Sequence, residues 1–240
     1  MPTGYAHVQD AQNILTYYLT FQTLLMVSSI EDTVSKFIGI GERLIQLPAN
    51  ERQYYREAVS QTYRVLDNAI GLSIDKLNTI RVINDKTTYV NELRLLGSFS
   101  EWRDREREVK LCEPLQTAAG EIDATATKFK DMISIRDRDE LRRLIEQLRQ
   151  DRNGIAYLIR SSMTTLSDIA DDADKSPEGY QLAKETLVNK IRSLDEIRLE
   201  LHESEKKFVD ALSTTKPVAS DEGRTQKKSI FKRLFHMKST

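Results

Sequence analysis

The stretch ERQYYREAVSQTYRVLDNAIGLSIDKLNTIRVIN, residues 51–84, decides the fold. Its apolar and small side chains recur at steps of three and four residues, which is the spacing of one face of an α-helix. No proline interrupts it, and further apolar residues widen the stripe, so we predict a long central helix that touches more than one neighbour. The recurring positions are Tyr55, Val59, Tyr63, Leu66, Ile70, Ser73, Leu77 and Ile80.

The composition of the whole chain favours the same architecture. Charged residues make up 30% and apolar residues 39% of the 240 residues, with only 9 Gly and 5 Pro, which suits long helices and is poor in turn residues. The sequence therefore predicts an all-α protein, an elongated bundle of long, largely antiparallel helices. The 36 basic and 37 acidic side chains nearly cancel, so no overall field attracts nucleic acid, and we expect no nucleic-acid partner.

We expect three parts along the chain: a helical bundle over 1–213, a flexible linker over 214–225 and a basic amphipathic tail over 226–240. The last helix of the bundle should begin at Ser176-Pro177, an N-cap followed by a proline suited to the first helical position, and end near Ser213. The longest helices should have about 30 residues and run about 45 Å. Seven side chains on their apolar stripes should be buried, namely Leu66, Ile70, Leu77, Leu144, Leu148, Ile191 and Leu194.

Several element boundaries follow from local signals. Gly39 and Gly41 each weaken a helix interior, so we expect a kink or short break there. One helix should run from about Thr88 through the charged stretch 101–108, in which Trp102 most simply covers the edge of the core.

Two further signals lie in the second half of the chain. Asn153-Gly154 should kink or divide a long helix, and the acidic stretch Asp171–Lys175 should form a solvated turn.

The segment 11–30 is uncharged and has roughly the twenty residues needed to span a bilayer. Polar residues such as Gln12, Asn13 and Gln22 are scattered through it, and these are costly in lipid. We therefore interpret it as a buried bundle helix that continues into 32–47. The alternative is that it leaves the bundle and inserts into a membrane.

The residues that usually carry catalysis or bind metal are sparse. The single cysteine, Cys112, excludes an intramolecular disulfide and fits a reducing, cytoplasmic compartment. His7, His202 and His236 are too far apart in sequence to predict a zinc or di-iron site, and no phosphate-binding glycine loop occurs. Cys112 as a nucleophile and the carboxylates of 168–174 as a metal site remain weaker alternatives to structural roles. We therefore predict a non-enzyme without a cofactor.

The tail suggests a function. Ile230, Phe231, Leu234 and Phe235 would share one face of a helix, and basic side chains surround that face. The residues predicted to bind an anionic membrane surface are Lys227, Lys228, Ile230, Phe231, Lys232, Arg233, Leu234 and Phe235.

The leading hypothesis is a helical interaction or scaffold protein that docks a protein partner or a second copy through helix faces, in coiled-coil fashion, and is held at a membrane by this tail. The alternative is a membrane-perturbing effector of the pore-forming or cell-death type that inserts segment 11–30.

Overall fold

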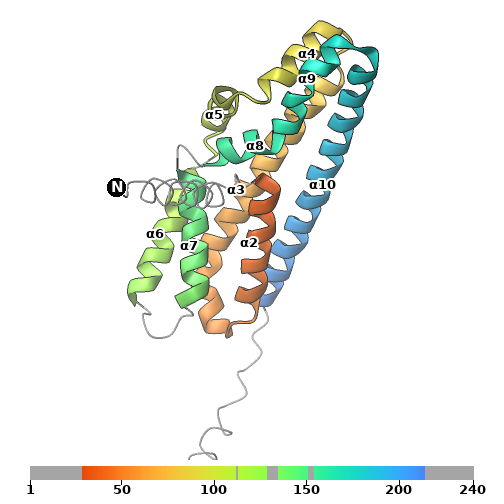
Figure 1. Ribbon diagram of the computed structural model, residues 1–240. Helices are drawn as coiled ribbons and strands as arrows, with labels where there is room; N and C mark the ends of the chain where they lie inside the picture. Colours follow the sequence, from red (N-terminus) through yellow and green to blue (C-terminus); the bar gives the residue numbers. More distant parts are fainter. Residues whose placement is uncertain (1–28, 112, 129–134, 151–153, 214–240) are drawn as a thin grey trace, which may run out of the picture.

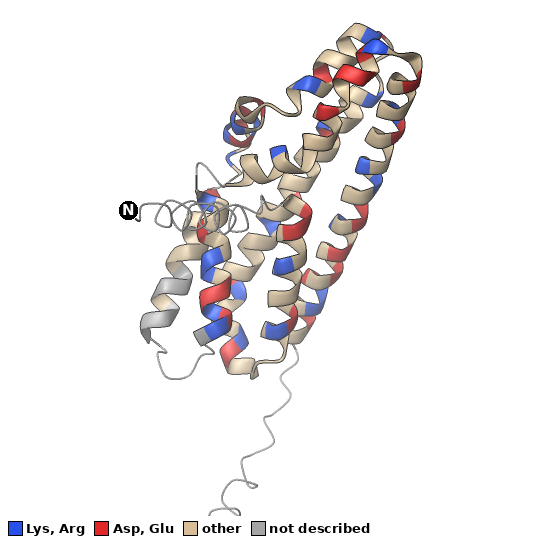
Figure 2. Ribbon diagram, in the orientation of Figure 1, with Lys and Arg blue, Asp and Glu red and all other residues tan. Residues whose placement is uncertain are grey.

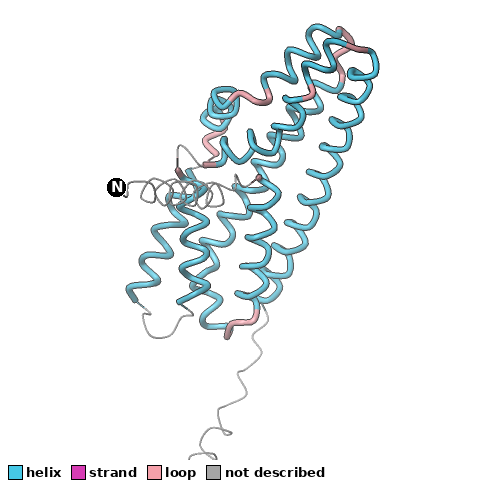
Figure 3. The backbone as a smooth tube through the Cα atoms, in the orientation of Figure 1, coloured by secondary structure: helices cyan, strands magenta, loops and turns pink. Residues whose placement is uncertain are grey.

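The computed structural model describes residues 29–111, 113–128, 135–150 and 154–213. Every regular element in these ranges is an α-helix (Figure 3). The all-α prediction is therefore confirmed. The predicted linker and tail, 214–240, and most of the uncharged segment 11–30 lie outside the described residues.

Two long helices, α3 (Ala49–Arg81) and α10 (Pro177–Ser213), form the framework of the described molecule (Figure 1). They have 33 and 37 residues, which corresponds to about 50 and 55 Å. Gln53 contacts Leu212, and Tyr63 contacts Ser204, so the two helices run in opposite directions. Ser176 accepts a hydrogen bond from the backbone N–H of Gly179, which confirms the predicted helix start. All seven side chains predicted to be buried are buried.

The remaining helices cover this pair in two groups (Figure 1). Near the N-terminus of α3, α2 (Ile30–Ile45) packs against α3 and α10, and α7 (Ile135–Arg149) packs against α2 and α6 (Glu113–Lys128). Near the C-terminus of α3 lie α4 (Lys86–Leu95), α5 (Phe99–Glu108), α8 (Ile155–Asp168) and α9 (Ala170–Lys175). We call the contact region of α4, α5 and α8 the corner.

Helix α2 differs from the sequence-based expectation in two ways. It begins at Ile30 with its own capping box, in which Ser29 and Asp32 each accept a hydrogen bond from the other's backbone N–H, so it does not continue a helix from segment 11–28. Of the kink or short break expected at Gly39 and Gly41, the break is wrong, because the helix is continuous through both. Gly41 is buried where the Tyr63 hydroxyl packs, 2.9 Å from the position that a Cβ would occupy. The glycine provides room for a neighbouring side chain.

The single helix expected from Thr88 through 101–108 is two helices. The chain turns over 96–98 between α4 and α5, and the indole Nε1 of Trp102 donates a 2.9 Å hydrogen bond back to the carbonyl of Leu96. Arg160 of α8 donates to the carbonyl of Gly97 in this turn, and Ser167 of α8 donates to the carbonyl of Arg94 near the end of α4. Trp102 is fully buried, as predicted, and contacts between helices fix the break.

The two signals in the second half of the chain have different outcomes. The division near Asn153-Gly154 is confirmed, since α7 ends at Arg149 and α8 begins at Ile155, with 151–153 outside the described residues. The solvated turn predicted for Asp171–Lys175 is wrong. This stretch belongs to α9, and its carboxylates are exposed on that short helix.

Candidate functional site

The residues predicted to bind a membrane, Lys227, Lys228, Ile230, Phe231, Lys232, Arg233, Leu234 and Phe235, all lie outside the described residues. Cys112 lies outside them as well. The described residue nearest to the tail in the sequence is Ser213, the last residue of α10. Among the described residues, the candidates for a functional site are therefore the polar clusters between the helices.

One cluster joins the N-terminus of α2 to α8 and α10. The Glu31 carboxylate accepts hydrogen bonds from the Ser162 hydroxyl at 2.6 and 2.7 Å and from the Lys190 ammonium at 2.5 Å. Burial acts to raise the pKa of Glu31, but the hydrogen bonds from Lys190 and Ser162 and the charge of Lys190 outweigh it and lower the pKa. The carboxylate is ionised at neutral pH.

This cluster contains a serine, a carboxylate and a lysine, which are residue types that form nucleophilic sites in some enzymes. A carboxylate whose pKa is lowered is a weak base and does not activate the Ser162 hydroxyl. The ammonium of Lys190 is already paired with the same carboxylate. The arrangement therefore fastens the capped start of α2 to two other helices.

A second cluster joins α3 to α10. Arg198 donates to both oxygens of Asp67, at 2.7 and 3.1 Å, and His202 Nε2 lies 2.6 Å from one of them. Burial acts to raise the pKa of Asp67, but hydrogen bonds from Arg198 and His202 together lower it. This bidentate geometry holds the guanidinium in one orientation.

Beside this cluster lies an open cleft of about 360 Å³, which we call the Arg198 cleft. The guanidinium of Arg198 lies against Gly71, with its atoms 3.6–3.8 Å from where a Cβ of that residue would be. Apolar side chains form one part of the wall and polar ones the rest. The lining residues are Asn68, Gly71, Leu72, Asp75, Val109 and Arg198.

The corner contains a third polar cluster. Lys76 is almost fully buried, and its ammonium lies 2.7 Å from a carboxylate oxygen of Glu92 and 3.2 Å from one of Glu101. Glu101 also accepts a hydrogen bond from Arg105 at 2.8 Å, as expected for this i,i+4 pair. The buried lysine therefore joins α3 to α4 and α5.

The carboxylates considered as a metal site have another partner. Arg94 of α4 lies 2.8 Å from Asp171 and 3.1 Å from Asp174, and its hydrogen bonds lower the pKa of Asp171. Among the described residues, no group of three or more His, Cys, Asp or Glu side chains could hold a metal ion. These aspartates link α4 to α9.

The buried tyrosines have no reactivity near neutral pH. The Tyr63 hydroxyl lies 2.6 Å from the Ser204 hydroxyl between α3 and α10. Burial raises the pKa of Tyr63 to about 12, and it does the same for Tyr55 and Tyr89. All three stay protonated at physiological pH.

Sequence reasoning did not identify Glu31, Ser162, Lys190, Asp67 or Arg198. Each looks like an ordinary polar position on a helix, because the partner lies more than 100 residues away. The sequence feature that could have identified one pair is opposite charge. When α3 and α10 are aligned in opposite directions, Asp67 and Arg198 lie opposite one another. That signal depends on the register of the two helices, which the apolar period alone does not determine.

None of the described helices is both long enough and apolar enough to cross a bilayer. Known proteins provide no further guide, since no family model matches the chain and no curated protein or solved structure is significantly similar to it. The function must be argued from the residues themselves.

Proposed function

We propose that this chain is a non-enzymatic helical interaction protein held at an anionic membrane surface by segment 226–240. The observation that carries the proposal is the sequence of that segment, in which four large apolar residues share a helical face among basic side chains. Each Lys or Arg near an anionic leaflet contributes about 1 kcal/mol, and partial burial of the apolar face adds a few more. The two contributions together hold a protein that neither would hold alone.

The described helices support a docking role. Their polar clusters each join two or three helices, so these side chains stabilise a rigid body. Charges of both signs are interspersed along the outside of α10 (Figure 2), and exposed apolar side chains lie among them, so we place the partner on this helix. The exposed apolar residues of α10 are Leu182, Val188, Leu199 and Val209.

Vesicle sedimentation tests the membrane role. We expect the full chain to sediment with vesicles that contain anionic lipid and not with neutral vesicles, and we expect added salt to weaken the binding. Phe231→Ser combined with Phe235→Ser should abolish it, because half of the large apolar side chains are then lost. Unchanged sedimentation of this double variant would show that charge alone is responsible.

A matched pair of charge variants locates the contact. Lys227→Gln with Lys228→Gln should weaken binding roughly tenfold or more. Lys206→Gln with Lys207→Gln removes the same charge from exposed positions on α10 and should leave binding unchanged. Equal losses from both pairs would contradict attachment through the tail. No sedimentation of the unmodified chain would remove the membrane from the proposal.

The start of α2 favours one alternative, a membrane-perturbing effector that inserts segment 11–30. The capping box at Ser29 and Asp32 satisfies the first backbone donors of α2, and Glu31 fastens this end to Ser162 and Lys190. Residues from Ser29 onward therefore suffice to cap and fasten the start of α2. Leakage of dye from vesicles that is lost on Leu24→Glu, with the fold retained, would favour this alternative, and binding without leakage would favour the docking protein.

A further inference from the structure

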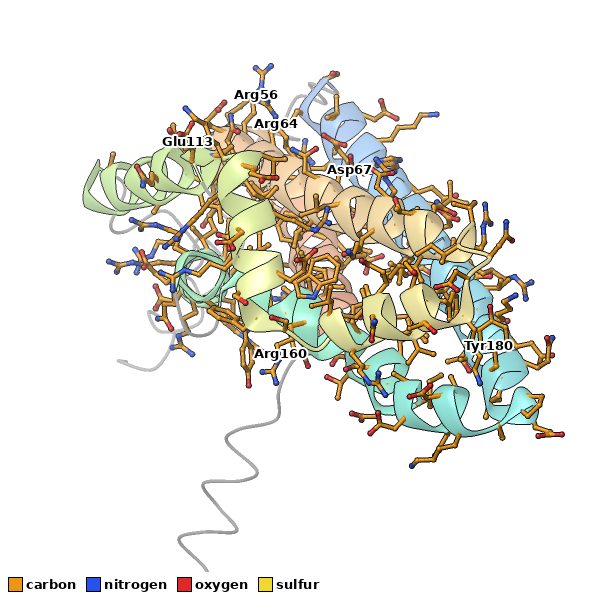
Figure 4. All side chains as sticks on the ribbon, turned by 90° about the horizontal axis from the view of Figure 1, so that it is seen from above. Arg56, Arg64, Asp67, Glu113, Arg160 and Tyr180 are labelled. Atoms are coloured by element: carbon orange, nitrogen blue, oxygen red, sulfur yellow. The ribbon has the colours of Figure 1, made fainter. Side chains whose placement is uncertain are left out.

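The Arg198 cleft has an excess of negative charge. Asp75 lines the cleft, and Asp67 binds the Arg198 guanidinium that forms part of its wall. These two carboxylates stand at the cleft beside the one guanidinium among the described residues that line it. The negative charge is confined to the cleft, because the basic side chain of Arg64 is exposed on α3 about one helical turn before Asn68. Asp67 and Arg64 lie on the same side of the molecule (Figure 4).

The cleft also has an apolar wall. Val109, the C-cap residue of α5, is 54% exposed there, and Leu72 of α3 lies beside it, half-buried. The C-terminal end of a helix carries partial negative charge, which adds to the attraction for a cation. A ligand that fits this cleft therefore carries positive charge next to large apolar side chains.

We propose that the Arg198 cleft is the docking site of the chain's own segment 226–238 when that segment is not on a membrane. Its sequence QKKSIFKRLFHMK supplies lysines and arginine for the carboxylates and phenylalanines for the apolar wall. The inference rests on the proposed membrane function, because the same basic and apolar side chains serve both surfaces. Docking in the cleft and binding to a membrane then exclude one another. The affinity of the cleft for the segment therefore sets the fraction of the protein that can bind a membrane.

The length of the chain permits this contact. Ser213 ends α10, 15 residues beyond Arg198, which is about 22 Å along the helix. Residues 214–225 span roughly 40 Å when extended. The segment that follows can therefore reach the cleft from the end of its own α10.

Amide spectra of the full chain test docking without any membrane. Lys232→Glu with Arg233→Glu should release the tail, and we expect shifts at amides around the cleft, in 68–75, at Val109 and at Arg198. A separate cleft between α2 and α10 is lined by Glu42, Ile45, Gln46, Lys207 and Asp210. Differences confined to residues after 213, or centred on this separate cleft, would overturn the proposal. Differences at the cleft that vanish on dilution would assign the occupant to a second copy and overturn docking within one chain.

Vesicle binding provides the second readout, with Asp75→Lys as the test and Glu57→Lys as its control. Both residues are exposed on α3, and both changes add the same charge. A docked fraction of nine-tenths would weaken membrane affinity about tenfold, so Asp75→Lys should raise affinity by roughly threefold to tenfold, and Glu57→Lys much less. Equal effects of the two variants would overturn the proposal. If no variant binds vesicles, the membrane function fails, and the amide spectra alone decide whether the tail occupies the cleft.

Discussion

The α3–α10 pair and the corner are built from the same kinds of side chain, yet only the first was predictable. In the pair, the apolar period runs unbroken and gives both the helix lengths and the buried positions. In the corner, the sequence between Thr88 and Glu108 predicts one helix, and the structure has two. The difference is that periodicity specifies a buried face, whereas the end of a helix in the corner depends on a contact with α8.

The contacts at the corner are few and specific. Trp102 donates to Leu96, Arg160 donates to Gly97, and Ser167 packs where a Cβ on Gly97 would be. Along α3 and α10 the stabilisation is spread over many side chains of similar weight. Substitutions at the corner should therefore destabilise mainly the helices of the corner. Substitutions along α3 and α10 should destabilise both long helices together.

Trp102→Ala should have the largest effect. It removes the largest fully buried side chain together with its hydrogen bond to Leu96, and we expect a loss of about 3–5 kcal/mol in the free energy of unfolding. Amide hydrogen exchange should show that protection is lost first in α4 and α5. Uniform loss of protection across α3 and α10 would contradict a locally stabilised corner.

Ile70→Ala tests the other region. Ile70 is fully buried on α3, so truncation should lower the free energy of unfolding by about 2–5 kcal/mol in urea titrations. Protection should fall in α3 and α10 together, because the stripe they share unfolds as one unit. A loss well below this range would show that α3 is peripheral to the fold.

Gly97→Ala sharpens the comparison at the turn. Its Cβ would lie 2.5 Å from the Ser167 hydroxyl oxygen, so overpacking should cost about 1–3 kcal/mol. Ser167→Gly in the same chain should restore part of that loss, which a double-mutant cycle of urea midpoints measures. Strictly additive effects would mean that the close approach to α8 does not determine the break.

Two glycines of α2 provide a matched pair. Gly41→Ala places a Cβ 2.9 Å from the Tyr63 hydroxyl and should destabilise the protein by about 1–2 kcal/mol. Gly39→Ala meets no atom closer than 3.9 Å and should stabilise it by roughly 0.5–1 kcal/mol through helix propensity. Thermal unfolding of both variants is the measurement. The same sign for both would contradict a packing role specific to Gly41.

Glu31→Gln should have the smallest destabilising effect, about 1 kcal/mol near pH 7. The folded pKa of Glu31 lies below its ordinary value of 4.5, so its ionised form stabilises the protein above that pH. This contribution is lost as the pH falls through the folded pKa. The difference in unfolding free energy between the two proteins should therefore shrink below about pH 4.5. A difference that stays constant down to pH 3 would show that ionisation of Glu31 is not responsible.

The sequence by itself determined the helical class, the two long helices and their buried stripes. The physical reason is that an apolar period of 3.6 and a capped start such as Ser176-Pro177 act within one or two helical turns, so neighbouring residues contain the information. The candidate membrane segment is likewise a prediction of sequence alone, since the arrangement of Phe231 and Phe235 among basic residues is local.

Only the tertiary structure decided that α2 stays continuous through its glycines, where the corner breaks and which charges meet. Gly41 and Gly97 look alike in sequence, but Tyr63 fills the space beside one within a continuous helix, and Ser167 packs against the other at a turn. The Arg198 cleft depends in the same way on helices α3, α5 and α10 coming together. Such contacts join residues far apart in the chain, and the register between helices that creates them is not encoded in any single stretch.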